Sequence, residues 1–159
     1  MKKKYGKKFF ENRGSSSDSA KEIVPIICTF LNPKNVVDVG CGTGEWLYFF
    51  KKKGVKQILG VDGPWVKRNL LKISKDEFLP HDLNKKIDLN KKFDLVVSLE
   101  VAEHLPEKNA KKFVKTLTGL GDFVLFSAAI PYQGGTNHFN EQWQSYWADL
   151  FKKRRFLPN

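Results

Sequence analysis

The order of apolar and polar positions along the chain predicts strands that alternate with helices. Runs rich in β-branched and aromatic residues indicate five strands, at residues 36–40, 57–61, 77–80, 93–99 and 123–130. Apolar residues recur at helical spacing in five other segments, at 19–31, 45–53, 65–74, 109–120 and 141–156. Such alternation favours right-handed crossovers, and therefore an α/β fold of three layers around a mostly parallel sheet.

The two ends of the chain differ in pattern. The first eighteen residues are basic and then rich in Gly and Ser, which predicts a mobile arm at 1–18 ahead of a single domain at 19–159. In the last helix, the large apolar residues are spaced as one helical face. We interpret this stripe as a core face rather than an aromatic ligand site; it comprises Trp143, Tyr146, Trp147, Leu150 and Phe151.

Composition excludes several classes of protein. The chain has 159 residues and 41% hydrophobic residues, which fits one globular domain. Cys28 and Cys41 have neither a CxxC partner nor metal-ligand spacing, so they are interpreted as free thiols, and no metal site is expected. No apolar run is long enough for a membrane span or a signal peptide. The expected location is the cytoplasm.

The charge is strongly basic but widely spread. The formal net charge is +11, and short lysine runs occur throughout, with denser clusters at 2–8 and 152–155. A basic surface attracts phosphate without any motif, so the excess favours either an anionic partner such as RNA or merely a solvated surface. Both interpretations stay open.

A glycine turn follows the first predicted strand. Gly40, Gly42 and Gly44 form GxGxG, which differs from the GxGxxG of dinucleotide-binding folds. Glycines let a small ligand lie directly on the backbone, and Asp38 would repel phosphate but pair with an ammonium group. The segment resembles the first motif of class I S-adenosylmethionine-dependent methyltransferases.

That resemblance implies a Rossmann-like fold and S-adenosyl-L-methionine as cofactor. The family usually completes seven strands, whereas five are predicted here. We therefore expect a fold without the C-terminal strand 6/7 hairpin, and a recorded C-terminus at Asn159 that is not a natural domain end. Such a sheet would keep an exposed edge.

Further cofactor contacts are expected where the next strands end. Asp62 follows the second strand about twenty residues after the glycines, where a carboxylate accepts ribose hydroxyls. Asp82 and Leu83 resemble the family's adenine-facing motif, although an acidic residue after a short strand is also an ordinary turn residue. The resemblance implies a full cofactor set of Asp38, Gly40, Cys41, Gly42, Gly44, Asp62, Gly63, Asp82, Leu83, Leu99 and Glu100.

The fourth strand ends in an E-x-x-E-H sequence formed by Glu100, Glu103 and His104. This end resembles the type 11 and ubiquinone-biosynthesis methyltransferases of small molecules. His104 is a candidate general base because imidazole titrates near neutral pH, while the alternative is a histidine that only orders the loop. The chain has no N-P-P-Y, D-P-P-Y or P-C strand end, which disfavours two kinds of base methylation.

A polar loop with flexible glycines follows the fifth strand at 131–143. We expect Asn137 and Glu141 to contact substrate and His138 to be the second base candidate. Alternatively, Asn140 and Glu141 simply cap and begin the last helix. Aromatic residues in this loop suit a hydroxylated or sugar-like acceptor.

Together these features predict an enzyme that transfers a methyl group to an oxygen, or a nitrogen, of a small-molecule or glycan-like acceptor. Two alternatives remain: an RNA (tRNA) methyltransferase that uses the terminal lysine clusters, and a non-catalytic module that binds a cofactor or a partner. The sequence names neither the acceptor, nor the base, nor the oligomeric state.

Overall fold

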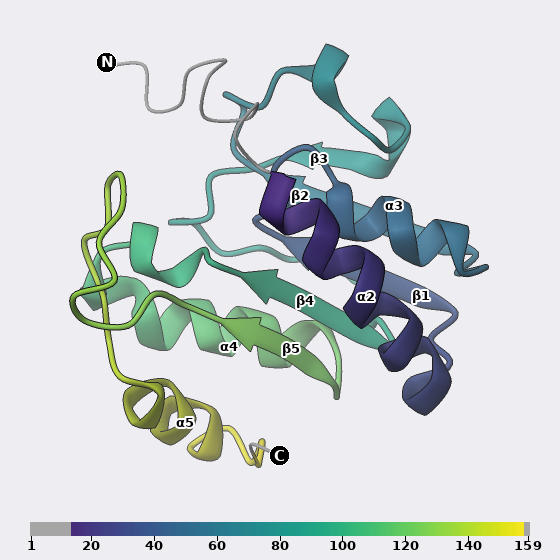
Figure 1. Cartoon of the computed structure of the whole chain (residues 1–159). Helices are drawn as coiled ribbons and strands as arrows, with labels where there is room; N and C mark the ends of the chain where they lie inside the picture. Colours follow the sequence, from purple (N-terminus) through teal and green to yellow (C-terminus); the bar gives the residue numbers. More distant parts are fainter. Residues whose placement is uncertain (1–13, 158–159) are drawn as a thin grey trace. The chain divides into compact units, whose positions relative to one another are not determined.

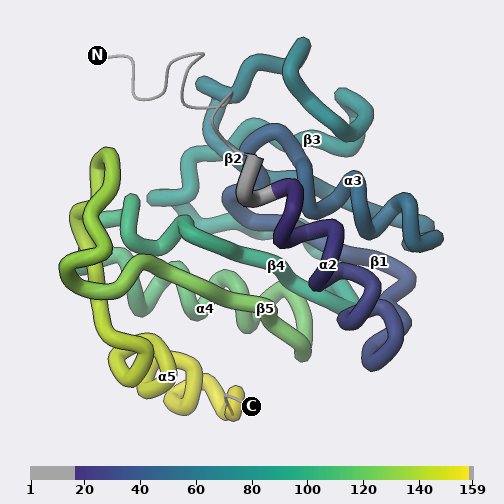
Figure 2. Tube along the Cα trace, in the orientation of Figure 1, coloured from purple at the N-terminus to yellow at the C-terminus, as the bar shows by residue number. Residues whose placement is uncertain are grey.

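The structure is a computed structural model that describes residues 14–157. The chain divides into two compact units, Met1–Asp82 and Leu83–Asn159 (Figures 1 and 2). Most of the predicted arm lies outside the described residues. Its last part does not, because helix α2 (Gly14–Leu31) already begins at Gly14.

The first unit contains three parallel strands in the order β3-β2-β1. Strand β1 (Asn35–Val39) pairs with β2 (Gln57–Asp62), and β2 pairs with the short β3 (Phe78–Pro80). The register sets Asp38 opposite Gly60 and Asp62 opposite Pro80. All three strands therefore end at one edge of this unit's sheet, where ligands bind in open parallel sheets.

Helices α2 and α3 (Glu45–Lys52) cover these strands. Helix α3 packs on β1 and β2, and α2 packs along α3 (Figure 1). Leu47 and Phe50 of α3 are fully buried, as is Val24 of α2. Helix α3 thus begins directly after the glycine turn and is held there by its apolar face.

The predicted helix at 65–74 is wrong. This segment contains only a 3-10 turn, η1 (Arg68–Leu70), flanked by extended backbone at Lys67 and Leu71. The Lys72 N–H donates to the Thr43 carbonyl at 2.8 Å, so the segment is tied to the glycine turn in an open conformation. A second 3-10 turn, η2 (Lys75–Glu77), leads into β3.

The second unit contains two parallel strands, β4 (Leu95–Leu99) and β5 (Val124–Ser127). Two 3-10 turns follow β4, η3 (Ala102–His104) and η4 (Glu107–Asn109), and they lead into helix α4 (Ala110–Leu120). Helix α4 packs on β4 through one apolar face. That face buries Phe113, Val114, Leu117 and Leu120. Strand β5 ends at Ser127, earlier than predicted, and a long loop follows it (Figure 2).

Helix α5 (Gln144–Lys152) closes the second unit. Trp147, Leu150 and Phe151 are buried, and the Phe126 ring of β5 lies 5.3 Å from the Trp147 ring and 5.1 Å from the Phe151 ring. The predicted core face is confirmed for these residues. Trp143 is different, because it precedes the helix and is 53% exposed.

The predicted fold class is confirmed. All strand pairs within each unit are parallel, and helices alternate with the strands along the chain. Between residues 14 and 157 the chain forms five strands, in agreement with the five predicted. In the same span, no helix combines the length and apolar character needed to cross a membrane.

Candidate functional site

The glycine turn of the first unit has a backbone that only glycine adopts easily. Gly40, Gly42 and Gly44 have φ angles of 93°, 56° and 84°, all in the left-handed region. A Cβ at Gly44 would also come within 3.0 Å of the Ile73 side chain. The turn is therefore compact, with no side chain between its backbone and a ligand at the three glycines.

Asp62 ties the end of β2 to this turn. Its Oδ2 accepts a hydrogen bond from the Gly42 N–H at 2.7 Å, and its Oδ1 accepts one from the Gly63 N–H at 2.5 Å. The Gly40 N–H donates to the Val61 carbonyl at 2.7 Å. Each carboxylate oxygen has a second lone pair, so the expected ribose contact is compatible with these bonds and stays a prediction.

The other predicted cofactor residues of the first unit surround the same turn. Asp38 lies within β1 and is 3% exposed. Cys41 is also buried and packs against Gly60, so that a Cβ added at Gly60 would lie 2.7 Å from Cys41 Sγ. Asp82 is half-buried and follows β3 at the end of this unit. Leu83, expected beside it, is buried at the start of the second unit.

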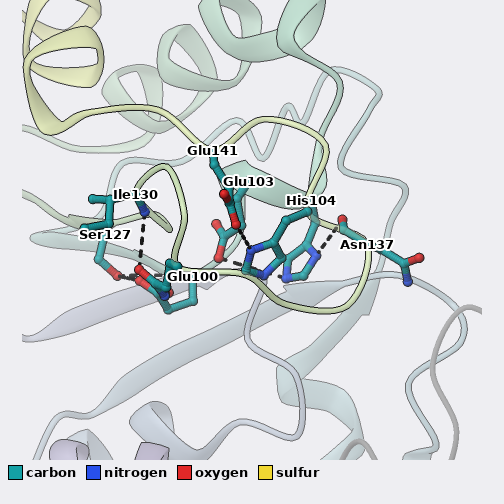
Figure 3. A network of polar contacts seen from close by, with 9 residues as sticks. Glu100, Glu103, His104, Ser127, Ile130, Asn137 and Glu141 are labelled. Carbon is teal, nitrogen blue, oxygen red and sulfur yellow. Dashed lines mark hydrogen bonds and ion pairs between the residues drawn. The ribbon is translucent and has the colours of Figure 1, made fainter.

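Glu100 follows β4 in the second unit and joins it to the segment after β5. Its carboxylate accepts hydrogen bonds from Ser127 Oγ at 2.8 Å and from Gln133 Nε2 at 3.1 Å (Figure 3). Its φ angle of 55° is unusual for a residue other than glycine. Glu100 and Leu99 were predicted to line the cofactor, and the contacts made by Glu100 are compatible with that role.

Glu103 is the most unusual residue of this unit. It is fully buried, and neither carboxylate oxygen has a hydrogen-bond partner among the described residues. Burial raises the pKa of this carboxyl from 4.5 to about 7, although nearby backbone groups and His138 act in the opposite direction. A buried ionised carboxylate is costly, so this carboxyl is favoured either in its protonated form or beside a cation.

The backbone of Glu103 brings the polar loop to the E-x-x-E-H sequence. Its carbonyl accepts hydrogen bonds from the Phe139 N–H at 2.8 Å and the Asn140 N–H at 3.1 Å. As a result His138 lies beside His104, with ring centroids 4.9 Å apart. The structure thus brings together the two histidines that the sequence predicted as base candidates.

Hydrogen bonds determine which nitrogen of each histidine carries the proton. His104 Nδ1 lies 3.2 Å from the Asn137 carbonyl oxygen, and His138 Nδ1 lies 2.9 Å from Glu141 Oε1 (Figure 3). Both partners are acceptors. The Asn137 partner is a backbone carbonyl, and the hydrogen bond to His138 lowers the pKa of Glu141 and so favours its ionised form. With acceptors at both Nδ1 atoms, the neutral form of each ring carries its proton on Nδ1 and its lone pair on Nε2. His104 Nε2 is 4.0 Å from Glu103 Oε1.

Glu103, His104 and His138 form a set of potential metal ligands, which we call the Glu-His-His cluster. One ligand atom from each lies within 4.8 Å of the others. Two imidazoles and one carboxylate are a ligand set that leaves coordination positions open. The sequence did not predict this cluster, because His138 is far from Glu103 in sequence and only the route of the loop brings them together.

Asn137 and Glu141, the predicted substrate contacts, both bond to these histidines. Asn140 does not cap the last helix; it is buried, and Trp143 occupies the N-cap position. Three aromatic side chains of the loop are exposed, at 95%, 61% and 53%. They belong to Tyr132, Phe139 and Trp143.

Comparisons with known proteins show the family and the fold of this chain. A family model described as "Methyltransferase domain" matches residues 16–153. No curated protein matches the chain significantly. An O-methyltransferase family protein from Burkholderia thailandensis is 14% identical with a TM-score of 0.69, and the match covers 91% of this chain and 52% of that one.

Two further solved structures are similar. The methyltransferase domain of bacterial CtHen1 is 24% identical with a TM-score of 0.65, covering 84% of this chain and 83% of that one. The small RNA methyltransferase HEN1 is 18% identical with a TM-score of 0.67, covering 84% of this chain and 21% of that one. This chain thus spans about half of the Burkholderia protein and a smaller part of HEN1. The family match extends over most of the sequence, so the chain belongs to the methyltransferase domain family and has the class I Rossmann-like fold.

Proposed function

We propose that this chain transfers a methyl group from S-adenosylmethionine to a hydroxyl oxygen of its acceptor, with a divalent cation held by the Glu-His-His cluster. The observation that carries the proposal is the fully buried Glu103 carboxylate, which has no hydrogen-bond partner among the described residues and faces His104 Nε2. A divalent cation would supply the missing positive charge.

The first unit has the features needed to hold the cofactor. When bound, S-adenosylmethionine supplies a methyl group attached to a sulfonium sulfur. The acceptor attacks the methyl carbon in line with the carbon–sulfur bond, and the sulfur leaves. The left-handed glycines leave room at the turn, and the buried Asp38 provides negative charge for the cofactor's ammonium group. Asp62, which accepts hydrogen bonds from the Gly42 and Gly63 N–H groups, is the candidate acceptor for the ribose hydroxyls.

The second unit has the features needed to activate an acceptor. The reaction forms an oxygen–carbon bond, breaks the sulfur–carbon bond to leave the neutral thioether of S-adenosylhomocysteine, and passes the hydroxyl proton to solvent or to a base. A divalent cation acts as a Lewis acid that lowers the pKa of a hydroxyl. A set of three protein ligands leaves open positions for the acceptor. In the alternative without metal, Nε2 of His104 or His138 accepts that proton as general base.

The experiment measures methyl transfer from labelled cofactor to glycans, RNA and small phenols, with Mn²⁺ or with EDTA. We expect activity that EDTA abolishes and Mn²⁺ restores. Full activity of the metal-free protein would reject the cation and favour a histidine base. If calorimetry shows no binding of S-adenosylmethionine and Asp62→Ala changes nothing, the proposed function itself fails.

RNA is the second candidate acceptor. The net charge of +11 favours a polyanion, and the exposed rings of Tyr132, Phe139 and Trp143 offer stacking surfaces for unpaired bases. One structural neighbour is named a small RNA methyltransferase. Binding of RNA that persists in moderate salt, together with methylated RNA as product, would favour this acceptor over a glycan or small molecule.

A further inference from the structure

The loop between β5 and α5 contains one side chain that bonds both to a cluster histidine and to the loop's own backbone. Glu141 Oε1 lies 2.9 Å from His138 Nδ1, while Glu141 Oε2 accepts a hydrogen bond from the Tyr132 N–H at 3.1 Å. The sequence predicted Glu141 as a substrate contact. That contact stays a prediction, and both oxygens have a partner within the protein.

We infer that Glu141 is a positioning residue, which fixes the tautomer and orientation of His138 so that Nε2 is available to a cation. The inference rests on the proposed function. A carboxylate that accepts a hydrogen bond from one ring N–H of a metal-ligating histidine fixes the orientation of that ring. It also makes the other ring nitrogen a better metal ligand. Each Glu141 oxygen has a hydrogen-bond partner within the loop, so its carboxylate links His138 to the loop backbone.

The loop is shaped to keep this contact. Tyr132 has a φ angle of 72°, which is costly for a residue with a side chain, and its N–H is held by Glu141. Gly135, with a φ angle of 153°, passes so close to His138 that a Cβ would lie 2.4 Å from Nε2. The loop thus confines the His138 ring from the backbone side while Glu141 holds Nδ1.

His104 offers a useful internal comparison. Its Nδ1 is held by the Asn137 backbone carbonyl, which no side-chain substitution removes, whereas the partner of His138 is a side chain. Substitution at Glu141 should therefore affect one ring and spare the other. The unaffected His104 signal becomes a reference within the same molecule.

The test compares wild type, Glu141→Ala and Glu141→Asp by ¹⁵N NMR of the histidine rings in the metal-free protein, and by Mn²⁺ titration. In wild type we expect both rings protonated on Nδ1. In Glu141→Ala, His138 should show a mixture of tautomers and His104 should not change, while Mn²⁺ affinity falls by about 10- to 100-fold. Glu141→Asp should recover part of both properties.

Gln133→Ala is the matched control. It removes another contact of the loop, the bond from Gln133 Nε2 to Glu100 at 3.1 Å, without touching His138. If loosening of the loop explained the effect, Gln133→Ala would lower Mn²⁺ affinity as much as Glu141→Ala, and the inference would be rejected. An unchanged His138 tautomer in Glu141→Ala would also reject it, even if wild type binds Mn²⁺. A shifted tautomer with no Mn²⁺ binding in wild type would retain the role of Glu141 and reject the metal.

Discussion

The glycine turn of the first unit and the Glu-His-His cluster of the second are built on different principles. The turn is made by contiguous residues, and its backbone is held by Asp62, whose Oδ2 lies 2.7 Å from the Gly42 nitrogen. The cluster is made by side chains from two distant segments, joined through the Glu103 carbonyl and the loop backbone. Backbone sites tolerate little variation in conformation, whereas side-chain sites depend on long-range packing. The two sites should therefore fail independently and for different reasons.

Separate loss of the two ligands is the largest expected effect. Glu103→Gln removes the only carboxylate of the cluster, so Mn²⁺ affinity should fall by about 100-fold or more, while S-adenosylmethionine affinity stays within about twofold. Asp62→Ala should do the reverse, because it leaves the Gly42 and Gly63 N–H groups without their carboxylate partner. Calorimetric titration of both ligands into both variants measures this. Equal weakening of both ligands by either variant would contradict the comparison.

A pH effect on stability should distinguish the cluster from the turn. Glu103 has a pKa raised from 4.5 to about 7, so its contribution to stability is complete below pH 4.5. As pH rises from 4.5 to 7, the unfolded chain loses the proton while the folded chain keeps it, and stability falls by roughly 3 kcal/mol. Urea unfolding of the metal-free protein across this range measures the change.

Glu103→Gln should remove most of this pH dependence, whereas Asp62→Ala should retain it. A wild-type stability that is flat between pH 4.5 and 7 would show that the buried carboxyl already has a compensating partner.

Two neighbouring glycines test how closely the loop confines His138. Gly134→Ala meets no atom within 4 Å and introduces only backbone strain, of about 1 kcal/mol, at a φ angle of 69°. Gly135→Ala also introduces backbone strain, at a φ angle of 153°, and in addition places a Cβ 2.3 Å from His138 Cε1, so the ring must move. We expect Gly135→Ala to weaken Mn²⁺ binding by about tenfold and Gly134→Ala to leave it within about twofold. Equal effects of the two variants would mean that strain, and not the ring contact, controls the cluster.

The smallest effect concerns acceptor recognition. Trp143 and Phe123 are exposed to the same extent, 53% and 54%, and both belong to the second unit, but only Trp143 lies in the loop that carries His138. Trp143→Ala should raise the KM for the acceptor several-fold with kcat nearly unchanged, and Phe123→Ala should change neither. Both variants should stay within about 0.5 kcal/mol of wild-type stability. Steady-state kinetics that show no difference between them would remove Trp143 from the acceptor site.

The pattern along the chain predicted the parallel strands and the glycine turn because these depend on local sequence. Val36, Val37 and Val39 are buried in β1, and the turn follows at once. The helix expected at 65–74 failed for a tertiary reason. Ile73 packs on Gly44 and Gly60, and the Lys72 N–H bonds to the Thr43 carbonyl. The segment therefore buries its apolar side chains in an extended conformation, without forming a helix.

The candidate site was predicted residue by residue but not as an assembly. His104 and His138 were both identified, yet each was considered as an isolated base. Their pairing depends on the Phe139 and Asn140 N–H groups that bond to the Glu103 carbonyl, and no local pattern encodes such a contact. The same holds for the bond between Glu141 and His138, which no local pattern predicts, while the expected substrate contact of Glu141 stays a prediction.

The contacts of Asp62 also have a consequence for the kinetics of cofactor capture. Because hydrogen bonds within the protein link the Asp62 carboxylate to Gly42 and Gly63, we expect the turn to be preorganised. Association should then proceed without a slow rearrangement of this segment, and the observed rate should rise linearly with cofactor concentration, with no plateau that would report a preceding isomerisation.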